Sequence, residues 1–476
     1  MVTDHKNLIE NFKAVSAVPR GSGFNEKISG FLCDFAKENG LEYIQDEALN
    51  VIIKRPGSKG YENASPVVLQ GHMDMVCVAD PGVSHNFETE GISLVYEGDW
   101  VRANGTTLGG DDGFALAAGM SLLTDKDLVT PPLICVFTTD EETGMDGAKA
   151  LDPKVFEGVK YLINLDSENE NECLCGCAGG LRIDGRVPVA RQWVKGDILH
   201  ISLTGLRGGH SGAEIHKGIT NAVRLLARVL FELKSIAGFC VVNMQGGEKD
   251  NAIPSSAEAT IVLDDCFDIA KIKEYIKNIE TKYRRAEENI SFDLELMDAC
   301  ETTACTKDSF DRVLYVLLTA PNGVQAMSPS VEGLVETSLN LGIFALKDNE
   351  ACFNYSLRSS CIGEKEFLSQ RVRLILENAG GTGAEKNAYP AWEYRTDSVL
   401  RDKYVAKFKE VSGCEPKVNA IHAGVECGLF AEKCPSLDMI SIGPDMKDIH
   451  SPRERLDLAS SVRLYKVIEA VLAELK

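Results

Sequence analysis

The chain has 476 residues, 25% of them charged, and a formal net charge of −21. This length suits two or three domains, and the apolar content is that of an ordinary globular protein. The acidic balance argues against nucleic acid and anionic membranes as partners, because both attract basic surfaces.

Targeting and membrane segments are not recognisable in the sequence. The first residues lead into an amphipathic pattern rather than a signal peptide, and no apolar stretch approaches the ~18–20 residues needed to span a bilayer. The 15 cysteines are an odd number without a disulfide spacing, which predicts free thiols in a reducing cytoplasm. The dense group Cys173, Cys175 and Cys177 is interpreted as small buried residues in a glycine-rich turn.

The first third of the chain alternates helix-like and strand-like patterns. Helices are predicted over residues 4–16 and 26–39, and strands near 41–46, 50–55 and 66–71. A glycine-rich turn at 108–113 then opens another helix. The continuous apolar runs 133–137 and 161–165 are typical of strands covered on both faces. This alternation predicts a mostly parallel, doubly wound α/β sheet.

The pattern changes to α+β near residue 184 and returns to α/β after residue 391. In between, strands are predicted at 199–203 and 258–263, and helices at 221–234 and 269–289. A strand at 437–442 precedes a final helix that we expect Ser460 or Ser461 to cap. The predicted architecture is one α/β domain formed by residues 1–184 and 392–476, with an inserted α+β domain over 185–391.

Acidic residues and histidines stand where the predicted strands of the α/β domain end. They are His72 and Asp74, then Asp111 and Asp112 in the glycine-rich turn, then Glu141 and Glu142, Asp166, Asp445, Asp448 and His450. Ligands of open α/β sheets bind outside the carboxyl ends of the strands, so we expect these side chains to converge. Gathering so many like charges is costly without a cation.

Imidazole and carboxylate ligands suit zinc or a related divalent ion, and this number of ligands suits two ions that share one carboxylate. Adjacent side chains cannot both point the same way. Of Glu141 and Glu142, we therefore expect one to bind metal and the other to take a proton from water.

The order of these residues resembles the co-catalytic di-zinc aminopeptidase and carboxypeptidase family. Finer strings resemble its aminoacyl-histidine dipeptidase (carnosinase-like) branch over essentially the whole chain: GHMDMV (71–76), DSE (166–168), GCAGG (176–180), GGHSG (208–212), EIHKG (214–218) and IHSP (449–452).

The resemblance implies a role for each matching residue. In the α/β domain, which becomes the catalytic domain, Asp111 would bridge the ions, with His72 and Asp166 on one and Glu142 and His450 on the other. Glu141 would be the general base, and Asp74 would orient His72. The position after the bridging residue is usually Asn in this branch and is Asp112 here, so whether Asp111 or Asp112 bridges stays open.

The inserted domain is implied to be a lid that also carries a dimer contact. Its His210 would stabilise the developing oxyanion in a neighbouring subunit. Asn251 would bind substrate, and Arg358 would bind the terminal carboxylate of the substrate. Glu426 also matches a family string, and we expect it to line the pocket.

The implied function is hydrolysis of dipeptides, with Xaa-His as the expected class, by a cytoplasmic homodimer with two Zn²⁺ per subunit. Mn²⁺ and Co²⁺ are alternatives to zinc. A related amide hydrolase acting on tripeptides or N-acyl amino acids stays open, as does a non-catalytic peptide-binding protein on the same scaffold. An unligated base at Glu141 argues against the last, because a binding protein has no need of one.

Overall fold

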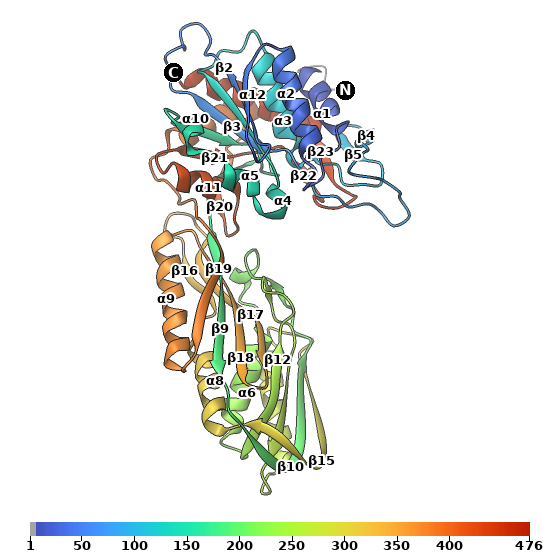
Figure 1. Cartoon of the computed structure of the whole chain (residues 1–476), viewed down its shortest axis with the longest axis vertical. Coiled ribbons are helices and arrows are strands. Elements are labelled where there is room, and N and C mark those ends of the chain that lie inside the picture. The colour runs from blue at the N-terminus through green and yellow to red at the C-terminus, as the bar shows by residue number, and fades with distance from the viewer. Residues whose placement is uncertain (1–5) are drawn as a thin grey trace. The chain divides into compact units, whose positions relative to one another are not determined.

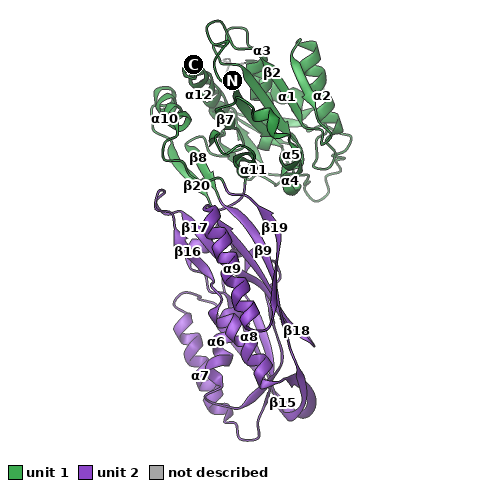
Figure 2. Cartoon of the chain, turned by 60° about the vertical axis from the view of Figure 1, so that its left-hand side comes forward, with its two compact units in different colours: residues 1–177, 392–421, 425–476 green, residues 178–391, 422–424 purple. Residues whose placement is uncertain are grey.

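The computed structural model describes residues 6–476, which form two compact units (Figures 1 and 2). Unit 1 contains residues 6–177, Trp392–Ile421 and Val425–Lys476, and unit 2 contains Ala178–Ala391 and His422–Gly424. The first division falls before the predicted residue 184, because β9 (Gly179–Pro188) pairs along its whole length with β18 (Glu350–Ser359) of unit 2. Residues 4 and 5 of the first predicted helix lie outside the described part of the chain.

Eight of the described strands form the sheet of unit 1, in the order β1-β2-β6-β3-β7-β21-β8-β20. Their bounds are β1 Glu42–Gln45, β2 Val51–Arg55, β3 Val67–His72, β6 Leu133–Thr138, β7 Tyr161–Asn164, β8 Glu172–Cys177, β20 Lys417–Ile421 and β21 Asp438–Ser441. The central strands β6, β3, β7 and β21 run parallel to one another. At one edge, β2 pairs antiparallel with β6, and β1 pairs antiparallel with β2. The predicted α/β fold with a mostly parallel centre is confirmed.

Apolar cores cover both faces of this sheet. Along β3, Val67 and Leu69 belong to one core and Val68 to another, and β6 alternates in the same way. Successive strand side chains point to opposite faces, so a doubly covered strand needs the unbroken apolar run seen in the sequence. Five helices contribute to the larger core: α1 (Lys6–Ser16), α2 (Glu26–Glu38), α3 (Gly110–Thr124), α10 (Val399–Ser412) and α12 (Leu458–Glu474). The smaller core includes residues of α5 (Asp146–Ala150) and α11 (Glu426–Lys433).

A small antiparallel sheet completes unit 1, in the order β22-β23-β5-β4. Its bounds are β4 Leu94–Glu97, β5 Trp100–Ala103, β22 Met446–Lys447 and β23 Arg455–Asp457. This sheet joins the segment before α3 to the segment between β21 and α12. Two loops distant in sequence are thereby held beside the end of the main sheet.

Unit 2 is α+β, as the sequence predicts. Its described strands pair antiparallel: β9, β10 (Arg191–Thr204), β12 (Phe239–Gly246), β14 (Ala257–Leu263), β15 (Ser291–Cys305), β16 (Gly323–Met327), β17 (Val335–Leu346), β18 and β19 (Thr382–Tyr389). The helices α6 (Ala222–Leu233), α7 (Ile269–Tyr283), α8 (Lys307–Thr319) and α9 (Ile362–Asn378) bury apolar stripes in the core of this unit (Figure 2). Within residues 6–476, no helix has both the length and the apolar character that crossing a membrane requires.

The cysteine group at 173–177 is buried as predicted, but it lies in strand β8 rather than in a turn. The sulfur atoms of Cys173 and Cys175 are 3.7 Å apart, because residues two apart in a strand share a face. All cysteines in residues 6–476 are free thiols.

The cap of α12 differs from the prediction. The N-cap is Asp457, whose carboxylate accepts hydrogen bonds from the backbone N–H groups of Ala459 (2.8 Å) and Ser460 (3.1 Å). Ser460 and Ser461 lie in the first turn, and both hydroxyls donate to the Asp457 carbonyl. The predicted serine cap was therefore wrong, because an aspartate precedes it and satisfies the free N–H groups of the first turn.

Replacing Asp457 with alanine should lower the free energy of unfolding by about 1 kcal/mol, because two backbone donors lose their acceptor. Asp457→Asn keeps an acceptor oxygen and should retain most of the stability. Urea unfolding followed by circular dichroism measures both changes. A greater loss for Ser461→Ala than for Asp457→Ala would favour a serine cap after all.

Candidate metal centre

The end of strand β3 places His72 and Asp74 at the carboxyl edge of the sheet. Both side chains are buried, and His72 Nδ1 lies 3.4 Å from Asp74 Oδ1. Asp74 also accepts hydrogen bonds from the Ser22 hydroxyl (2.8 Å) and the Glu141 backbone N–H (3.0 Å). Burial raises the pKa of Asp74, but His72 and these donors outweigh it and lower the pKa below its usual value. The ionised carboxylate therefore orients His72 and anchors the turn that carries Glu141.

Asp111 lies between two histidines. Its Oδ1 is 2.9 Å from His72 Nε2, and its Oδ2 is 3.1 Å from His450 Nε2. Burial alone raises the pKa of Asp111, but the two imidazoles hold it far below its usual range. In turn, Asp111 and Glu142 raise the pKa of His450 to about 10. Each oxygen of this carboxylate thus faces a different histidine.

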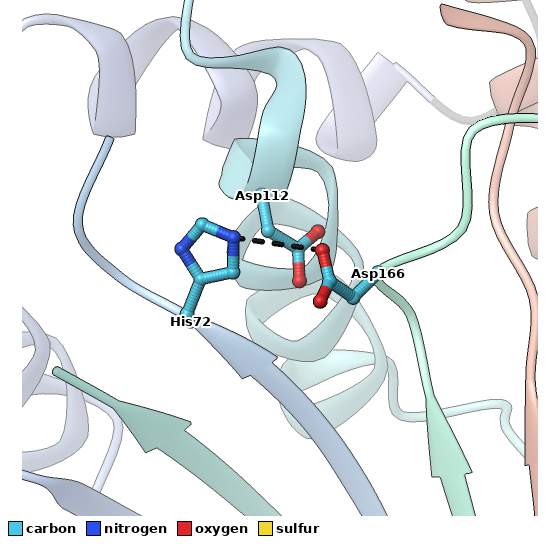
Figure 3. A group of neighbouring side chains, drawn as sticks. All are labelled: His72, Asp112 and Asp166. Atoms are coloured by element: carbon cyan, nitrogen blue, oxygen red, sulfur yellow. Dashed lines mark ion pairs between the residues drawn. The ribbon is translucent and has the colours of Figure 1, made fainter. Parts of the chain in front are cut away.

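Seven histidine, aspartate and glutamate side chains at this edge form three groups, and within each group the donor atoms lie within 4.8 Å of one another: His72–Asp112–Asp166, His72–Glu141–Glu142 and Asp111–Glu142–His450. Figure 3 shows the first group, with His72 at the end of β3, Asp112 at the start of α3 and Asp166 just after β7. His72 Nε2 is 3.5 Å from Asp166 Oδ1, and Glu142 Oε1 is 2.8 Å from His450 Nε2. The peptide bond between Asp111 and Asp112 is cis.

Burial, together with the crowding of carboxylates, sets the electrostatics of this centre. Burial and neighbouring carboxylates raise the pKa values of Asp112 and Asp166 well above their usual range. Burial likewise raises the pKa of Glu141 to about 7, with Glu142 and Asp111 adding to the shift. Burial lowers the pKa of His72, but Asp166 and Asp111 more than reverse this. Asp112 Oδ2 is buried without a hydrogen-bond partner in the described residues. Divalent cations would neutralise this surplus of negative charge, so the donor set fits metal ions.

Glu426 is fully buried below this edge of the sheet. Its carboxyl group accepts hydrogen bonds from Gln70 Nε2 (2.6 Å) on β3 and from the Thr138 hydroxyl (3.0 Å) on β6. Burial, with a contribution from Glu141, raises its pKa to about 8. The described contacts of Glu426 are with the protein itself, and its expected contact with substrate stays a prediction.

His210, Asn251 and Arg358 belong to unit 2. The short strands β11 (Gly209–His210) and β13 (Ala252–Ile253) pair antiparallel, with His210 opposite Ala252. This pairing brings His210 close to Asn251, the residue before β13. His210 Nδ1 accepts hydrogen bonds from the backbone N–H groups of Gly212 (3.2 Å) and Ala213 (3.0 Å), so its proton resides on Nε2. Burial and Arg358 lower the pKa of His210, which favours this neutral donor form.

Arg358 is 7% exposed and donates from Nη1 to the Tyr389 hydroxyl (2.9 Å). Its Nε is buried without a hydrogen-bond partner in the described residues. A Cβ added to Gly212 would lie 3.1 Å from this Nε and 3.0 Å from His210 Cε1. The glycine therefore allows the guanidinium and the imidazole to approach the same stretch of backbone.

Sequence reasoning assigned no role to Arg20, Ser22 or Glu454, all of which contact the segments that carry the ligands. Arg20 stands in a Pro-Arg-Gly turn with no motif around it. Glu454 stands between Arg453 and Arg455, a pattern typical of a solvated loop. Only its position four residues after His450 indicated in the sequence that Glu454 lies near the site.

The sequence profile described as Peptidase family M20/M25/M40 matches residues 68–474. The cytosol non-specific dipeptidase of Escherichia coli (strain K12) is 34% identical over 471 residues, which cover 98% of this chain and 96% of that protein. The crystal structure of aminoacylhistidine dipeptidase from Vibrio alginolyticus superposes with a TM-score of 0.92 at 32% identity, covering 99% of this chain and 97% of that one. An aminopeptidase from Bacillus cereus shares the fold at 14% identity, with a TM-score of 0.58 and coverage of 99% and 98%.

Zn²⁺ should raise the melting temperature of the chelator-treated protein, because an ion relieves the repulsion among the buried carboxylates. A metal at 100 times its dissociation constant stabilises the folded state by about 2.7 kcal/mol. Differential scanning calorimetry with and without Zn²⁺ measures the shift. Asp111→Asn should lose most of it, whereas Asp127→Asn, at an exposed loop position, should keep it. Equal shifts in both variants would place the ion elsewhere.

Proposed function

The chain belongs to Peptidase family M20/M25/M40, and we propose that it is a metal-dependent dipeptidase with two divalent ions in unit 1. The observation that carries this proposal is the position of Asp111, which presents one oxygen to each of two histidines. A carboxylate in this position is suited to bridge two ions. The names of the two similar proteins, both dipeptidases, support the substrate class.

The ligand assignment follows the contacts of the described residues. We assign His72, Asp111 and Asp166 to one ion and Asp111, Glu142 and His450 to the other. Asp111 is favoured over Asp112 as the bridge, because its two oxygens face different histidines, His72 and His450. We propose Zn²⁺ as the metal, with Mn²⁺ or Co²⁺ as alternatives. When bound, such ions polarise a carbonyl group and make water more acidic.

Glu141 is the proposed general base. It lies beside the ligand Glu142, and its raised pKa of about 7 suits a group that takes a proton from the attacking water and returns it to the leaving amine. The Glu141 backbone N–H is anchored on Asp74, which also faces His72. One aspartate thereby holds both the base and a ligand in place.

Unit 2 supplies the groups that would handle substrate. We propose that the Nε2–H of His210 donates to the oxygen that becomes negative during attack, a task for which its fixed tautomer is suited. Within residues 6–476 the buried Nε of Arg358 has no hydrogen-bond partner, and Arg358 would bind the terminal carboxylate, with Asn251 as a further polar contact. A homodimer in the cytoplasm, in which the lid supplies His210 to the neighbouring subunit, completes the proposal and is supported by the family resemblance alone.

Xaa-His dipeptides should be hydrolysed by the Zn²⁺-loaded protein, and Glu141→Gln should lower kcat by about 10²–10⁴-fold, because the water loses its proton acceptor. Metal content measured by atomic emission should stay at the wild-type level. The exposed Glu157→Gln is the matched control and should retain full activity. A panel of dipeptides, tripeptides and N-acetyl amino acids tests the substrate class, and faster turnover of the last two would favour a related amide hydrolase.

Co-expression of His210→Ala and Glu141→Gln subunits should recover roughly a quarter of the wild-type activity, since half of the dimers are mixed and each has one complete site. Pairing His72→Ala with Glu141→Gln is the control and should recover none, because both changes damage residues of unit 1. Activity assays on the unsorted mixture of co-expressed dimers measure the recovery. Its absence in the first pair would mean that each site is complete within one chain.

A further inference from the structure

The side chain of Glu454 binds the turn that carries Asp111. It is 2% exposed, and its two oxygens accept hydrogen bonds from four consecutive backbone N–H groups. Oε2 accepts from Leu108 (2.8 Å) and Gly109 (3.1 Å), and Oε1 accepts from Gly110 (2.7 Å) and Asp111 (3.4 Å). Both oxygens are thus committed to the backbone, so Glu454 acts on the turn rather than as a ligand.

Arg20 holds the same turn from the other side. Its guanidinium is buried and donates to the carbonyl of Gly109 and to the carbonyls of Met73 (3.2 Å) and Asp74 (3.0 Å). The N–H of Gly109 faces Glu454 while its C=O faces Arg20. The turn is therefore tied to the end of β3, where His72 and Asp74 lie.

The glycines of this turn are required by these two side chains. Gly109 has φ +67°, and an added Cβ would lie 2.5 Å from Arg20 Nη2. A Cβ on Gly110 would lie 3.3 Å from Glu454 Oε1, and one on Gly113 would lie 2.7 Å from Arg20 Nη2. The glycine-rich string therefore lets a buried cation and a buried anion reach the backbone.

Glu454 also belongs to the loop that presents His450. Its backbone N–H donates to the Ser451 carbonyl (3.0 Å), which closes a tight turn just after the histidine. One side chain thereby connects the loop of His450 to the turn of Asp111. Asp111 and His450 come from segments far apart in sequence. The contacts of Glu454 with both segments can fix the distance between them.

We infer that Glu454 is a positioning residue that sets the distance between Asp111 and His450 and so preorganises the metal position that these two residues share. The inference rests on the proposed function. Glutamine at this position would place an NH₂ group against backbone donors, and aspartate would be one methylene too short to reach all four N–H groups. Residues that orient metal ligands typically change metal affinity by about 10–100-fold when replaced.

A Co²⁺ titration of the chelator-treated full chain, followed by visible absorption, tests the inference without any peptide. The wild type should bind two ions. In Glu454→Gln, the affinity for one of them should fall by about 10–100-fold. A separate dipeptide assay of the same variant should show a lowered kcat and an unchanged KM. The exposed Glu157→Gln serves as the control and should titrate like the wild type. Thermal unfolding of the metal-free proteins reports any loss of fold.

Two results would overturn the inference. If Glu454→Gln bound both ions as the wild type does, Glu454 would be a structural residue only. If the wild type bound no Co²⁺, the proposed function would fail with it, and the two failures are told apart by this wild-type titration. Should Glu454→Gln fail to fold, Glu454→Asp shortens the side chain by one methylene, so that its carboxylate no longer reaches all four N–H groups. Unchanged Co²⁺ affinities in that variant would equally contradict the inference.

Discussion

The structure of unit 1 depends on one constraint, the gathering of carboxylates around two imidazoles at the end of a parallel sheet. Asp111 contacts both histidines, while Asp112, Asp166, Glu141 and Glu142 lie close by. Burying carboxylates is costly, and burial together with the neighbouring carboxylates raises the pKa values of Asp112 and Asp166. Such a cluster persists only where the surrounding fold is stable enough to hold it. The two apolar cores on either face of the sheet supply that stability.

The second requirement is geometric, because candidate ligands drawn from separate segments must be held at fixed separations. Buried polar side chains meet it by binding backbone rather than metal. Asp74 accepts from the Glu141 N–H, Glu454 accepts from the turn of Asp111, and Arg20 donates to carbonyls of two segments. These bonds lie in a low-dielectric interior, where a satisfied network is rigid. The chemistry of the centre is therefore prepared by residues that need not touch a substrate.

In unit 2, too, contacts with the backbone hold candidate functional side chains in place. The backbone N–H groups of Gly212 and Ala213 fix the tautomer of His210, and Gly212 leaves room for Arg358 next to it. A neutral imidazole donor and a buried guanidinium suit an oxyanion and a carboxylate. These groups match what the proposed hydrolysis of a dipeptide requires of a lid.

The sequence by itself determined the α/β class, the inserted α+β part and the convergence of the acidic residues and histidines, because apolar runs and acidic strand ends are local patterns. Val67–His72 and Leu133–Thr138 are recognisable for this reason. Only the tertiary structure decided that Asp111 rather than Asp112 faces both histidines and that Arg20 and Glu454 hold the glycine turn. These depend on contacts between segments up to 346 residues apart, as from Leu108 to Glu454. A long-range hydrogen bond leaves no periodic trace in the sequence, because its partners are chosen by packing.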